Sequence, residues 1–360
     1  MRVLLLSDAK SIHTKRWVEA LSQRSVDIML VSLSVPKDEF YKIHRVKCMY
    51  IDEAKFNAPT ISKFGYLKLV RLVKRAIEEF APDMLHAHYA SSYGLIGALS
   101  GFHPYIVSVW GSDVYEFPNL NIINRWIIHY VFSKADVLLS TSHVMAKETR
   151  KYTAKEILVT PFGVDTKRFK KTGVDVTEGK FVVGNVKTLA PKYGIDVLIK
   201  AYKLVVDHNC TLDTELRIYG EGPNKEEYEQ LAERLGIADK VKFMGWVDNA
   251  QLPEVYSSMS VSVSVSNSES FGVVAVEAMS CECPVVTSDA DGFTEVVDNG
   301  VTGFIVPKRD VEKTADAIQQ FIDDPTLRSK MGIEGRNRVL RLYDWDKNVS
   351  TMYNIYREII

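Results

Sequence analysis

The sequence predicts an α/β protein built from two Rossmann-like, doubly wound domains that face a central cleft. Short apolar runs alternate with amphipathic segments, as buried parallel strands alternate with helices. The alternation restarts after a turn-rich stretch, TPFGVDTKRFKKTGVD at residues 160–175. A chain of 360 residues that is 46% hydrophobic and 25% charged is long enough for two cores.

Each expected strand is a short apolar run flanked by a helical pattern. In the first half these runs are RVLLLS (2–7), VDIMLVSL (26–33), DMLHAHY (83–89), YIVSVWG (105–111) and DVLLSTS (136–142). In the second half they are KFVVGNVKTL (180–189), ELRIYGEG (215–222), VKFMGWV (241–247), VSVSVS (261–266), CPVVTSD (283–289) and TGFIVP (302–307). We therefore expect domains at residues 1–168 and 169–342, followed by an amphipathic helix at 343–360.

Charge and cysteine content indicate a reduced, cytoplasmic protein. The net charge is −1, but residues 1–165 hold 21 Lys and Arg against 16 Asp and Glu, which hints at an anionic partner for the first half. The four cysteines, Cys48, Cys210, Cys281 and Cys283, fit neither a zinc site nor a disulfide framework. The apolar run at the N-terminus is too short for a signal peptide or a membrane span. No nucleic-acid signature is present, so no nucleic-acid partner is expected.

The stretch SESFGVVAVEAMSCECPVV at residues 268–286 places Glu269 and Glu277 eight positions apart. With Ser270 as the helix N-cap and Gly272 in the first turn, the helix N-terminus would suit a phosphate. A rise of about 1.5 Å per residue separates the carboxylates by roughly 12 Å, too far for a glycosidase pair. The spacing fits a longer ligand, with sugar hydroxyls at one carboxylate, a ribose at the other and a diphosphate between them. For a single Glu, a solvent-facing position on an ordinary helix is the commoner alternative.

Loops after three other strands carry candidate contacts for the same ligand. Lys187 and Lys192 follow a strand expected to end at Gly184–Asn185, and two ammonium groups there would clamp a diphosphate. Gly220 and the segment Gly245, Trp246 and Val247 follow further strands, where backbone can approach a base or a phosphate. The alternatives are solvated lysines and ordinary turn glycines. The G-x-G-x-x-G pattern of a classical NAD site is absent.

The run from Ser266 to Pro307, SNSESFGVVAVEAMSCECPVVTSDADGFTEVVDNGVTGFIVP, resembles the nucleotide-binding signature of the retaining glycosyltransferases of family 4, the group 1 glycosyltransferases with the GT-B fold. KTLAPKYGIDVLI, YGEGP and FMGWV extend the resemblance, and SIHTKRWVEAL and SVWGSDVY extend it more loosely into the first half. The resemblance implies that Glu277 binds the donor ribose. It implies that Glu269 and the backbone of Ser270, Phe271 and Gly272 hold the donor sugar and phosphate. Lys187 and Lys192 would clamp the diphosphate, with Lys187 standing where many members have Arg.

The resemblance also implies a nucleoside-diphosphate sugar as donor, retention at the anomeric carbon, and no metal or other cofactor. It further implies that the helix at 343–360 crosses back to the first domain. The first half departs from the family pattern in two places. Lys10–His13 replaces a Gly-Gly loop, and Trp110 stands where many members carry His before the Gly-x-Asp. Trp110 is interpreted either as a sugar-stacking residue or as a core residue at a strand end.

The residues expected to be catalytic are Lys187, Lys192, Glu269, His88 and Asp113. Asp8, His13 and Trp110 are expected on the acceptor side. Of the alternating His86 and His88, only one is expected to face the cleft, and His88 is chosen. A metal pair there is not expected, because no third ligand stands nearby. For Asp8, His13 and Asp113, loop capping and turn chemistry are the alternative.

The helical segment KFGYLKLVRLVKRAIEEFAP at residues 63–82 has a basic face with Lys68, Arg71 and Arg75. Normal α/β spacing favours an ordinary packed helix, and contact of the basic face with anionic lipid at the inner membrane surface is the other interpretation.

The function predicted is transfer of a sugar from a UDP- or GDP-linked donor to a hydroxyl of a glycan, glycolipid or lipid-linked acceptor, in cell-surface polysaccharide or glycoconjugate synthesis. The alternatives are a nucleotide-sugar epimerase and a non-catalytic sugar-nucleotide-binding subunit.

Overall fold

The computed structural model describes residues 1–36, 38–50, 63–173, 179–209 and 211–360. The chain divides into two compact units. The first domain comprises Met1–Phe162 together with Lys347–Ile360, and the second comprises Gly163–Asp346. The sequence prediction put these divisions after residues 168 and 342.

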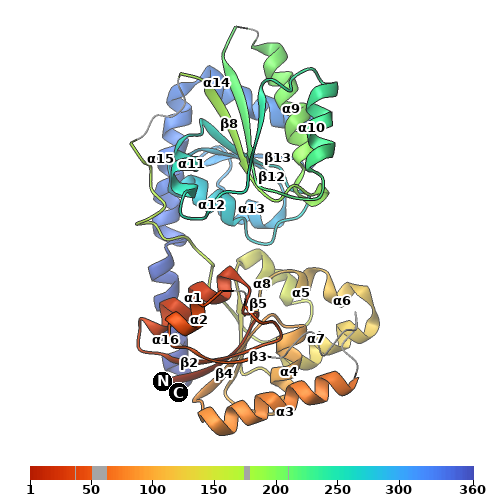
Figure 1. Ribbon diagram of the computed structural model, residues 1–360, viewed down its shortest axis with the longest axis vertical. Helices are drawn as coiled ribbons and strands as arrows, with labels where there is room; N and C mark the ends of the chain where they lie inside the picture. Colours follow the sequence, from red (N-terminus) through yellow and green to blue (C-terminus); the bar gives the residue numbers. More distant parts are fainter. Residues whose placement is uncertain (37, 51–62, 174–178, 210) are drawn as a thin grey trace. The chain divides into compact units, whose positions relative to one another are not determined.

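The first domain is built on a seven-stranded parallel sheet with the order β3-β2-β1-β4-β5-β6-β7 (Figure 1). Its strands are β1 (Arg2–Leu6), β2 (Asp27–Ser32), β3 (Lys47–Tyr50), β4 (Met84–His88), β5 (Tyr105–Val109), β6 (Val137–Ser140) and β7 (Ile157–Val159). Its helices are α1 (Ile12–Ser22), α2 (Phe40–Ile43), α3 (Lys63–Phe80), α4 (Ser92–Ser100), α5 (Ser112–Tyr115), α6 (Phe117–Leu120), α7 (Ile122–Lys134), α8 (His143–Thr149) and α16 (Trp345–Ile359).

Alternating side chains divide the core of the first sheet between its two faces. On one face, Leu4, Leu85 and Val107 pack against α3, α4 and α7 in a single buried cluster. On the other face, the hydroxyl of Tyr356 in α16 lies 2.6 Å from Nδ1 of His86 in β4. The C-terminal helix is therefore tied to the sheet whose first strand begins at residue 2.

The second domain repeats the plan with a six-stranded parallel sheet in the order β10-β9-β8-β11-β12-β13. Its strands are β8 (Phe181–Val186), β9 (Thr214–Tyr219), β10 (Val241–Gly245), β11 (Val261–Ser264), β12 (Val285–Ser288) and β13 (Gly303–Val306). Its α-helices are α9 (Ile195–His208), α10 (Lys225–Arg234), α11 (Leu252–Ser257), α12 (Val273–Ser280), α13 (Asp291–Val296), α14 (Val311–Asp323) and α15 (Pro325–Leu342), and η2 (Pro191–Tyr193) is a 3₁₀ turn. Helix α9 packs on α10 and α14, whereas α12 packs on α11, α13 and α15 (Figure 1).

The predicted fold class of two Rossmann-like domains is confirmed, and all of the expected strands are present. The sequence analysis missed β3 and β7, which are short strands at the edges of the first sheet. In both sheets the strand order reverses beside the first strand, between β1 and β4 and between β8 and β11. Loops at the carboxyl ends of these strands line the usual ligand crevice of open α/β sheets.

Cys48, Cys281 and Cys283 are free thiols, and Cys210 lies outside the described residues. Within the described part of the chain, no helix has the length and apolar character needed to cross a membrane.

Candidate functional site

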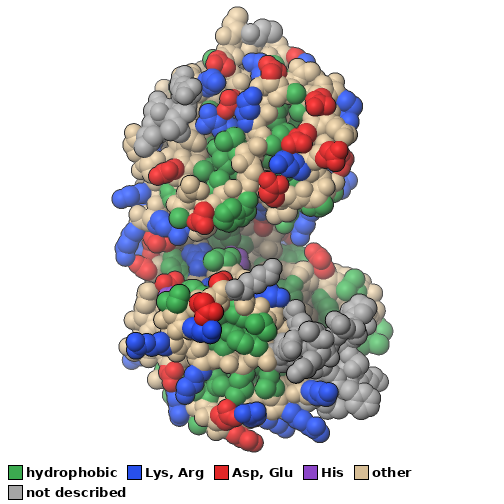
Figure 2. Space-filling model, in the orientation of Figure 1, with side chains coloured by type: hydrophobic (Ala, Val, Ile, Leu, Met, Phe, Trp, Pro, Cys, Tyr) green, Lys and Arg blue, Asp and Glu red, His purple; other side chains and the backbone are tan. Residues whose placement is uncertain are grey.

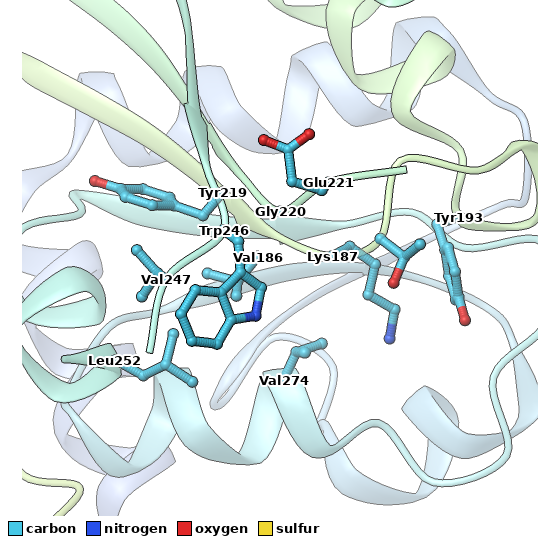
Figure 3. Close-up of a pocket in the computed structure, with 11 residues that line it drawn as sticks. Val186, Lys187, Tyr193, Tyr219, Gly220, Glu221, Trp246, Val247, Leu252 and Val274 are labelled. Carbon is cyan, nitrogen blue, oxygen red and sulfur yellow. The ribbon is translucent and has the colours of Figure 1, made fainter. Parts of the chain in front are cut away.

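A cavity of about 350 Å³ opens at the carboxyl edge of the second sheet (Figure 3). The ends of β8, β9 and β10 and the first turn of α12 meet at this cavity. The lining residues are Val186, Lys187, Thr188, Tyr193, Tyr219, Gly220, Glu221, Trp246, Val247, Leu252 and Val274. Four residues predicted from sequence, Lys187, Gly220, Trp246 and Val247, are thus brought together in one pocket.

Lys187 is held at this pocket by a carboxylate and an aromatic ring. Its Nζ lies 2.7 Å from Oε2 of Glu269, and each of the two side chains is 14% exposed. The same Nζ lies 4.8 Å from the ring centroid of Tyr193, within cation–π range. The strand β8 runs to Val186, beyond the expected end at Asn185, and this places Lys187 directly at the sheet edge. The ammonium group therefore has a fixed position beside the cavity.

The start of α12 corrects one expectation. The N-cap is Gly272, with φ 94°, and not Ser270. A Cβ on Gly272 would lie 2.8 Å from the Phe293 ring, and a positive φ is costly for other residues, so glycine is required here. The amide of Ser270 instead donates to Oε1 of Glu269 at 3.3 Å. Ser270 thus orients the carboxylate that pairs with Lys187.

The side chain of Phe271 is buried in the second domain. Its side chain is 2% exposed and its ring packs against Tyr343 at 5.7 Å between centroids. Only the backbone of Phe271 can therefore contribute to a ligand site. This agrees with the backbone role that the resemblance implies for the segment from Ser270 to Gly272.

Glu277 lies in the second turn of α12 and is 7% exposed. The hydroxyl of Tyr256, from α11, donates to its Oε2 at 3.0 Å. Burial raises the pKa of Tyr256 well above its ordinary value, and the nearby Glu277 carboxylate adds to this. Tyr256 therefore remains a hydrogen-bond donor that holds Glu277. The sequence analysis missed Tyr256, which stands 21 residues before Glu277 in a short helix without a recognisable motif.

Gly220 is the second position where glycine is required. It has φ 134°, and a Cβ would lie 2.0 Å from the carbonyl oxygen of Lys187. Its amide donates to the Gly245 carbonyl at 2.8 Å, so the ends of β8, β9 and β10 close together. Trp246, which follows Gly245, is 70% exposed. Figure 3 shows its indole on the side of the pocket where Leu252 and Val274 lie.

Lys192 lies next to Tyr193 in the sequence, but unlike Tyr193 it does not line the pocket. It is exposed, in the 3₁₀ turn before α9, and its carbonyl accepts from the Asn267 amide at 2.8 Å. The turn is thereby tied to the loop after β11. The diphosphate clamp with Lys192 stays a prediction.

The residues that the sequence predicts for the acceptor side lie in the first domain, and here the expectation for the two histidines was wrong. Residues two apart on a strand share a face, so His86 and His88 point the same way, with ring centroids 4.6 Å apart. His88 Nδ1 lies 3.0 Å from the Ser7 hydroxyl, and His86 Nε2 lies 2.8 Å from the Ser108 hydroxyl. Burial lowers the pKa of His86 to about 3 and that of His88 well below its ordinary value. Both rings are therefore neutral.

An aromatic cluster surrounds these histidines. The ring of His13 stacks on Phe162 at 4.1 Å and meets Trp110 edge-on at 6.0 Å. Trp110 lies 4.5 Å from the ring of His88. Burial lowers the pKa of His13 to about 4, and the charge of Arg16 adds to this. His13, His88 and Trp110 thus form one group at the ends of β1, β4 and β5.

The two candidate aspartates of the first domain, Asp8 and Asp113, accept hydrogen bonds from loop residues. Asp113 is fully buried and accepts from the amides of Ala90 and Gly111, each at 2.8 Å, and of Trp110 at 3.2 Å. Burial raises its pKa, although these amides act in the opposite direction. Asp8 accepts from the amide of Lys10 at 3.0 Å and from the hydroxyl of Ser34. These bonds match the loop-capping alternative and place Asp113 as the residue that positions Trp110.

Among the described residues, no group of three His, Cys, Asp or Glu side chains could hold a metal ion. The charged residues that line the second-domain pocket are Lys187 and Glu221, and Glu269 forms an ion pair with Lys187.

Comparison with known proteins agrees with this geometry. Residues 166–338 match the model of glycosyl transferases group 1, and residues 2–142 match that of the glycosyl transferase 4-like domain. The chain is 31% identical over 306 residues to D-inositol 3-phosphate glycosyltransferase of Kribbella flavida, covering 76% of this chain and 71% of that protein. It is 25% identical over 396 residues to the capsular polysaccharide biosynthesis glycosyltransferase CapM of Staphylococcus aureus, covering 98% and 96%.

Among solved structures, Anabaena HepE in complex with UDP superposes with a TM-score of 0.85 at 20% identity, over 99% of this chain and 100% of that one. The chain therefore has the two-domain Rossmann-like GT-B fold, and its matches to the two glycosyl transferase models define it as a glycosyltransferase. The chain belongs to the group 1 glycosyltransferases.

Proposed function

We propose that this enzyme transfers a sugar from a UDP- or GDP-linked donor to a hydroxyl of a glycan, glycolipid or lipid-linked acceptor, with retention at the anomeric carbon. The observation that carries the proposal is the pairing of Lys187 with Glu269 at a cavity whose floor is the first turn of α12. A cation and a helix N-terminus at one sheet edge provide two sources of positive potential for a diphosphate. The complex of HepE with UDP supports a nucleoside diphosphate in this role.

The proposed donor pose follows from the two carboxylates. Glu277, held by Tyr256, takes the ribose hydroxyls, and Glu269 takes hydroxyls of the donor sugar. The diphosphate lies between them against Lys187, with Lys192 as a second cation. Trp246 and Val247 border the nucleobase end of the pocket.

The reaction breaks the bond between the anomeric carbon and the diphosphate oxygen and forms a bond from that carbon to the acceptor oxygen. The proton of the acceptor hydroxyl passes to the departing phosphate oxygen, and the electron pair of the broken bond leaves with the nucleoside diphosphate. Lys187 stabilises the charge that grows on this leaving group, and fixed cations stabilise such charge most in a water-poor site. In this scheme no metal or other cofactor takes part.

The acceptor is proposed to bind the first domain beside Trp110, His13 and His88. An aromatic face suits the apolar face of a sugar ring. The name of CapM supports capsular or other cell-surface polysaccharide synthesis as the setting.

The testing experiment is a calorimetric and thermal-shift screen against UDP, GDP and ADP and their sugar conjugates, because a ligand that binds the folded state raises its apparent stability. We expect one nucleotide to raise the melting temperature selectively and Glu277→Ala to abolish this shift. The absence of a shift with every nucleotide would contradict the proposal.

The second experiment is product analysis by NMR, with and without an acceptor sugar and with added EDTA. Conversion of the donor alone would indicate an epimerase, and binding without turnover would indicate a non-catalytic subunit. An inverted anomeric linkage, or loss of activity in EDTA, would contradict retention or metal independence respectively.

A further inference from the structure

Helices α6 and α7 of the first domain expose a group of large apolar side chains. Leu120, Ile122, Ile123 and Trp126 are 71%, 76%, 66% and 63% exposed. On its opposite side, α7 buries Ile128, Val131 and Phe132 in the core. A helix that packs one face on a sheet normally shows polar residues on the other. A contiguous exposed apolar patch marks an interaction surface more often than chance.

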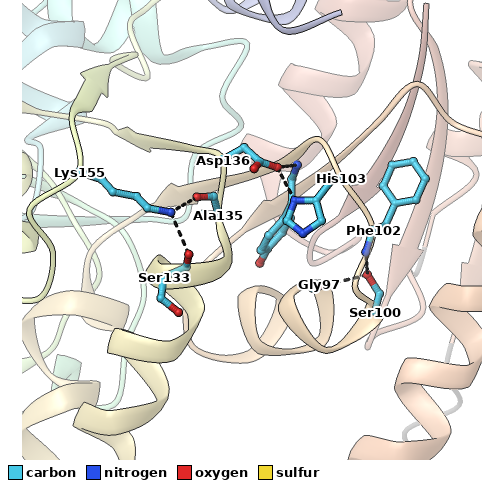
Figure 4. Close-up of polar contacts among 9 residues, drawn as sticks. Gly97, Ser100, Phe102, His103, Ser133, Ala135, Asp136 and Lys155 are labelled. Carbon is cyan, nitrogen blue, oxygen red and sulfur yellow. Dashed lines mark hydrogen bonds and ion pairs between the residues drawn. The ribbon is translucent and has the colours of Figure 1, made fainter.

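The patch stands on a helix that is fixed at both ends. At its start, the Asn121 side chain accepts from the Asn124 amide at 2.9 Å. At its end, the ammonium of Lys155 donates to the carbonyl of Ser133 at 2.9 Å and to that of Ala135, where a cation also suits the helix dipole (Figure 4). The exposed side chains therefore belong to an ordered surface.

The chain beyond α7 is fixed as well. Asp136 accepts from the Tyr105 amide at 2.7 Å and lies 2.6 Å from Nδ1 of His103 (Figure 4). These contacts join the start of β6 to the chain entering β5. Rearrangement of α7 to bury its apolar face would have to break them.

Aromatic and basic side chains accompany the patch. Trp126 stacks on Tyr130 with centroids 5.5 Å apart, and Lys134 lies 5.7 Å above the ring of Tyr130. Residues 117–135 include Arg125 and Lys134 but no Asp or Glu. Figure 2 shows hydrophobic side chains reaching the surface beside α6. Apolar tips with Trp, Tyr and cations and without acids are the composition of a segment that lies in a membrane interface.

Size and charge favour a lipid surface over a second copy of this chain. The four apolar side chains cover a few hundred Å², whereas a stable dimer buries about 800 Å² per partner. A two-fold contact through this face would also bring Arg125 and Lys134 towards their own copies without an acidic residue from 117–135 to neutralise them. Anionic headgroups neutralise such cations directly.

Helix α3, for which the sequence favoured ordinary packing over lipid contact, would add only basic side chains to such a surface. Its Leu69, Val73 and Ala76 are buried in the core, so its apolar face is occupied. Its exposed Lys68 and Arg71 belong to the same helical layer, since α3 packs on α4 and α4 packs on α7.

We propose that the exposed face of α6 and α7 docks on the interface of an anionic lipid bilayer, with Ile122 and Trp126 inserted between headgroups. This goes beyond the proposed glycosyl transfer, because docking needs neither donor nor acceptor.

The test is flotation of the purified full chain with vesicles of phosphatidylcholine alone and of phosphatidylcholine mixed with phosphatidylglycerol. Wild type is expected to float with the mixed vesicles and to be released partly by salt. The double variant Ile122→Ser/Trp126→Ser should bind at least roughly ten-fold more weakly, because two buried apolar side chains are lost. The control Ile43→Ser removes a 74% exposed isoleucine from α2 and should bind like wild type.

Two outcomes overturn the proposal: wild type that does not float with the mixed vesicles, and a double variant that floats as well as wild type. A wild-type dimer in sedimentation that the double variant abolishes would assign the patch to a second copy and would also overturn it. Circular dichroism of the variants controls for folding. Nucleotide binding measured without vesicles tests the proposed transferase site separately.

Discussion

The Nζ of Lys187 lies 2.7 Å from Oε2 of Glu269 and joins the end of β8 to the loop before α12. Since both side chains are only 14% exposed, each compensates a charge that would otherwise be poorly solvated. In the proposed function, the pair offers one hydrogen-bonding group to a phosphate and one to a sugar hydroxyl.

Lys187→Ala is expected to lower kcat by roughly 10²-fold or more, because a fixed cation next to a leaving diphosphate is lost. The measurement is turnover of the donor identified by the binding screen. Lys203→Ala is the control, because it removes a lysine from a solvent-exposed i,i+4 pair with Asp207 on α9 and should leave turnover unchanged. Equal activity of the two variants would remove Lys187 from the mechanism.

Tyr256→Phe is expected to weaken nucleotide binding by roughly ten-fold with a smaller effect on kcat. The variant keeps the buried ring and removes only the donor to Glu277, a bond to a charged group worth about 1.5–3 kcal/mol. Calorimetry with the nucleotide measures the change. The matched control is Tyr202→Phe, which removes another buried hydroxyl, 3.0 Å from Thr214, without a link to Glu277. If both variants bind alike, Tyr256 does not position the ribose carboxylate.

Trp246→Ala is expected to reduce nucleotide affinity by about 5- to 100-fold, the range for loss of a stacked aromatic partner. Stability should change little, because Trp246 is 70% exposed. Met244→Ala serves as control, since Met244 lies on β10 two residues before Trp246, is 48% exposed and does not line the pocket. A loss of affinity that is the same in both variants would point to a general effect of β10 and not to the indole.

The buried His86 predicts acid sensitivity of the first domain. Burial lowers its pKa from 6.5 to about 3, so between these values the unfolded chain binds a proton that the folded chain does not. Stability is therefore fully present above pH 6.5 and decreases as the pH falls towards 3. This group alone should remove about 2 kcal/mol between pH 7.5 and pH 5, and His88 acts with the same sign.

Urea unfolding of the wild type at several pH values checks this slope, and His86→Gln should flatten it. His143→Gln, at an exposed position, should leave it unchanged. A wild-type stability that does not vary between pH 7.5 and pH 5 would contradict the assignment of a neutral folded histidine.

The sequence predicted the two sheets and the second-domain pocket well, because both depend on local patterns. Apolar runs mark buried strands, and Lys187, Gly220 and Trp246 each follow such a run. The rest depends on contacts between distant segments. Tyr256 reaches Glu277 from another helix, and Asp113 accepts amides from two loops, which no spacing reveals. Gly272 caps α12 through a positive φ, which the motif did not distinguish from capping by Ser270. The sequence analysis missed the exposed apolar face of α7, because apolar residues on both the buried and the exposed face of this helix leave no amphipathic pattern.

The first domain is completed by residues that follow the entire second domain. Tyr356, 270 positions after His86, supplies the hydroxyl that lies against its ring. On the ribosome, this face of the first sheet, which includes Leu5 and Ile106 beside His86, therefore stays uncovered until the last helix emerges. A fragment that stops at Phe162 should be poorly soluble for the same reason, and rejoining residues 347–360 to it through a short linker should restore a folded domain.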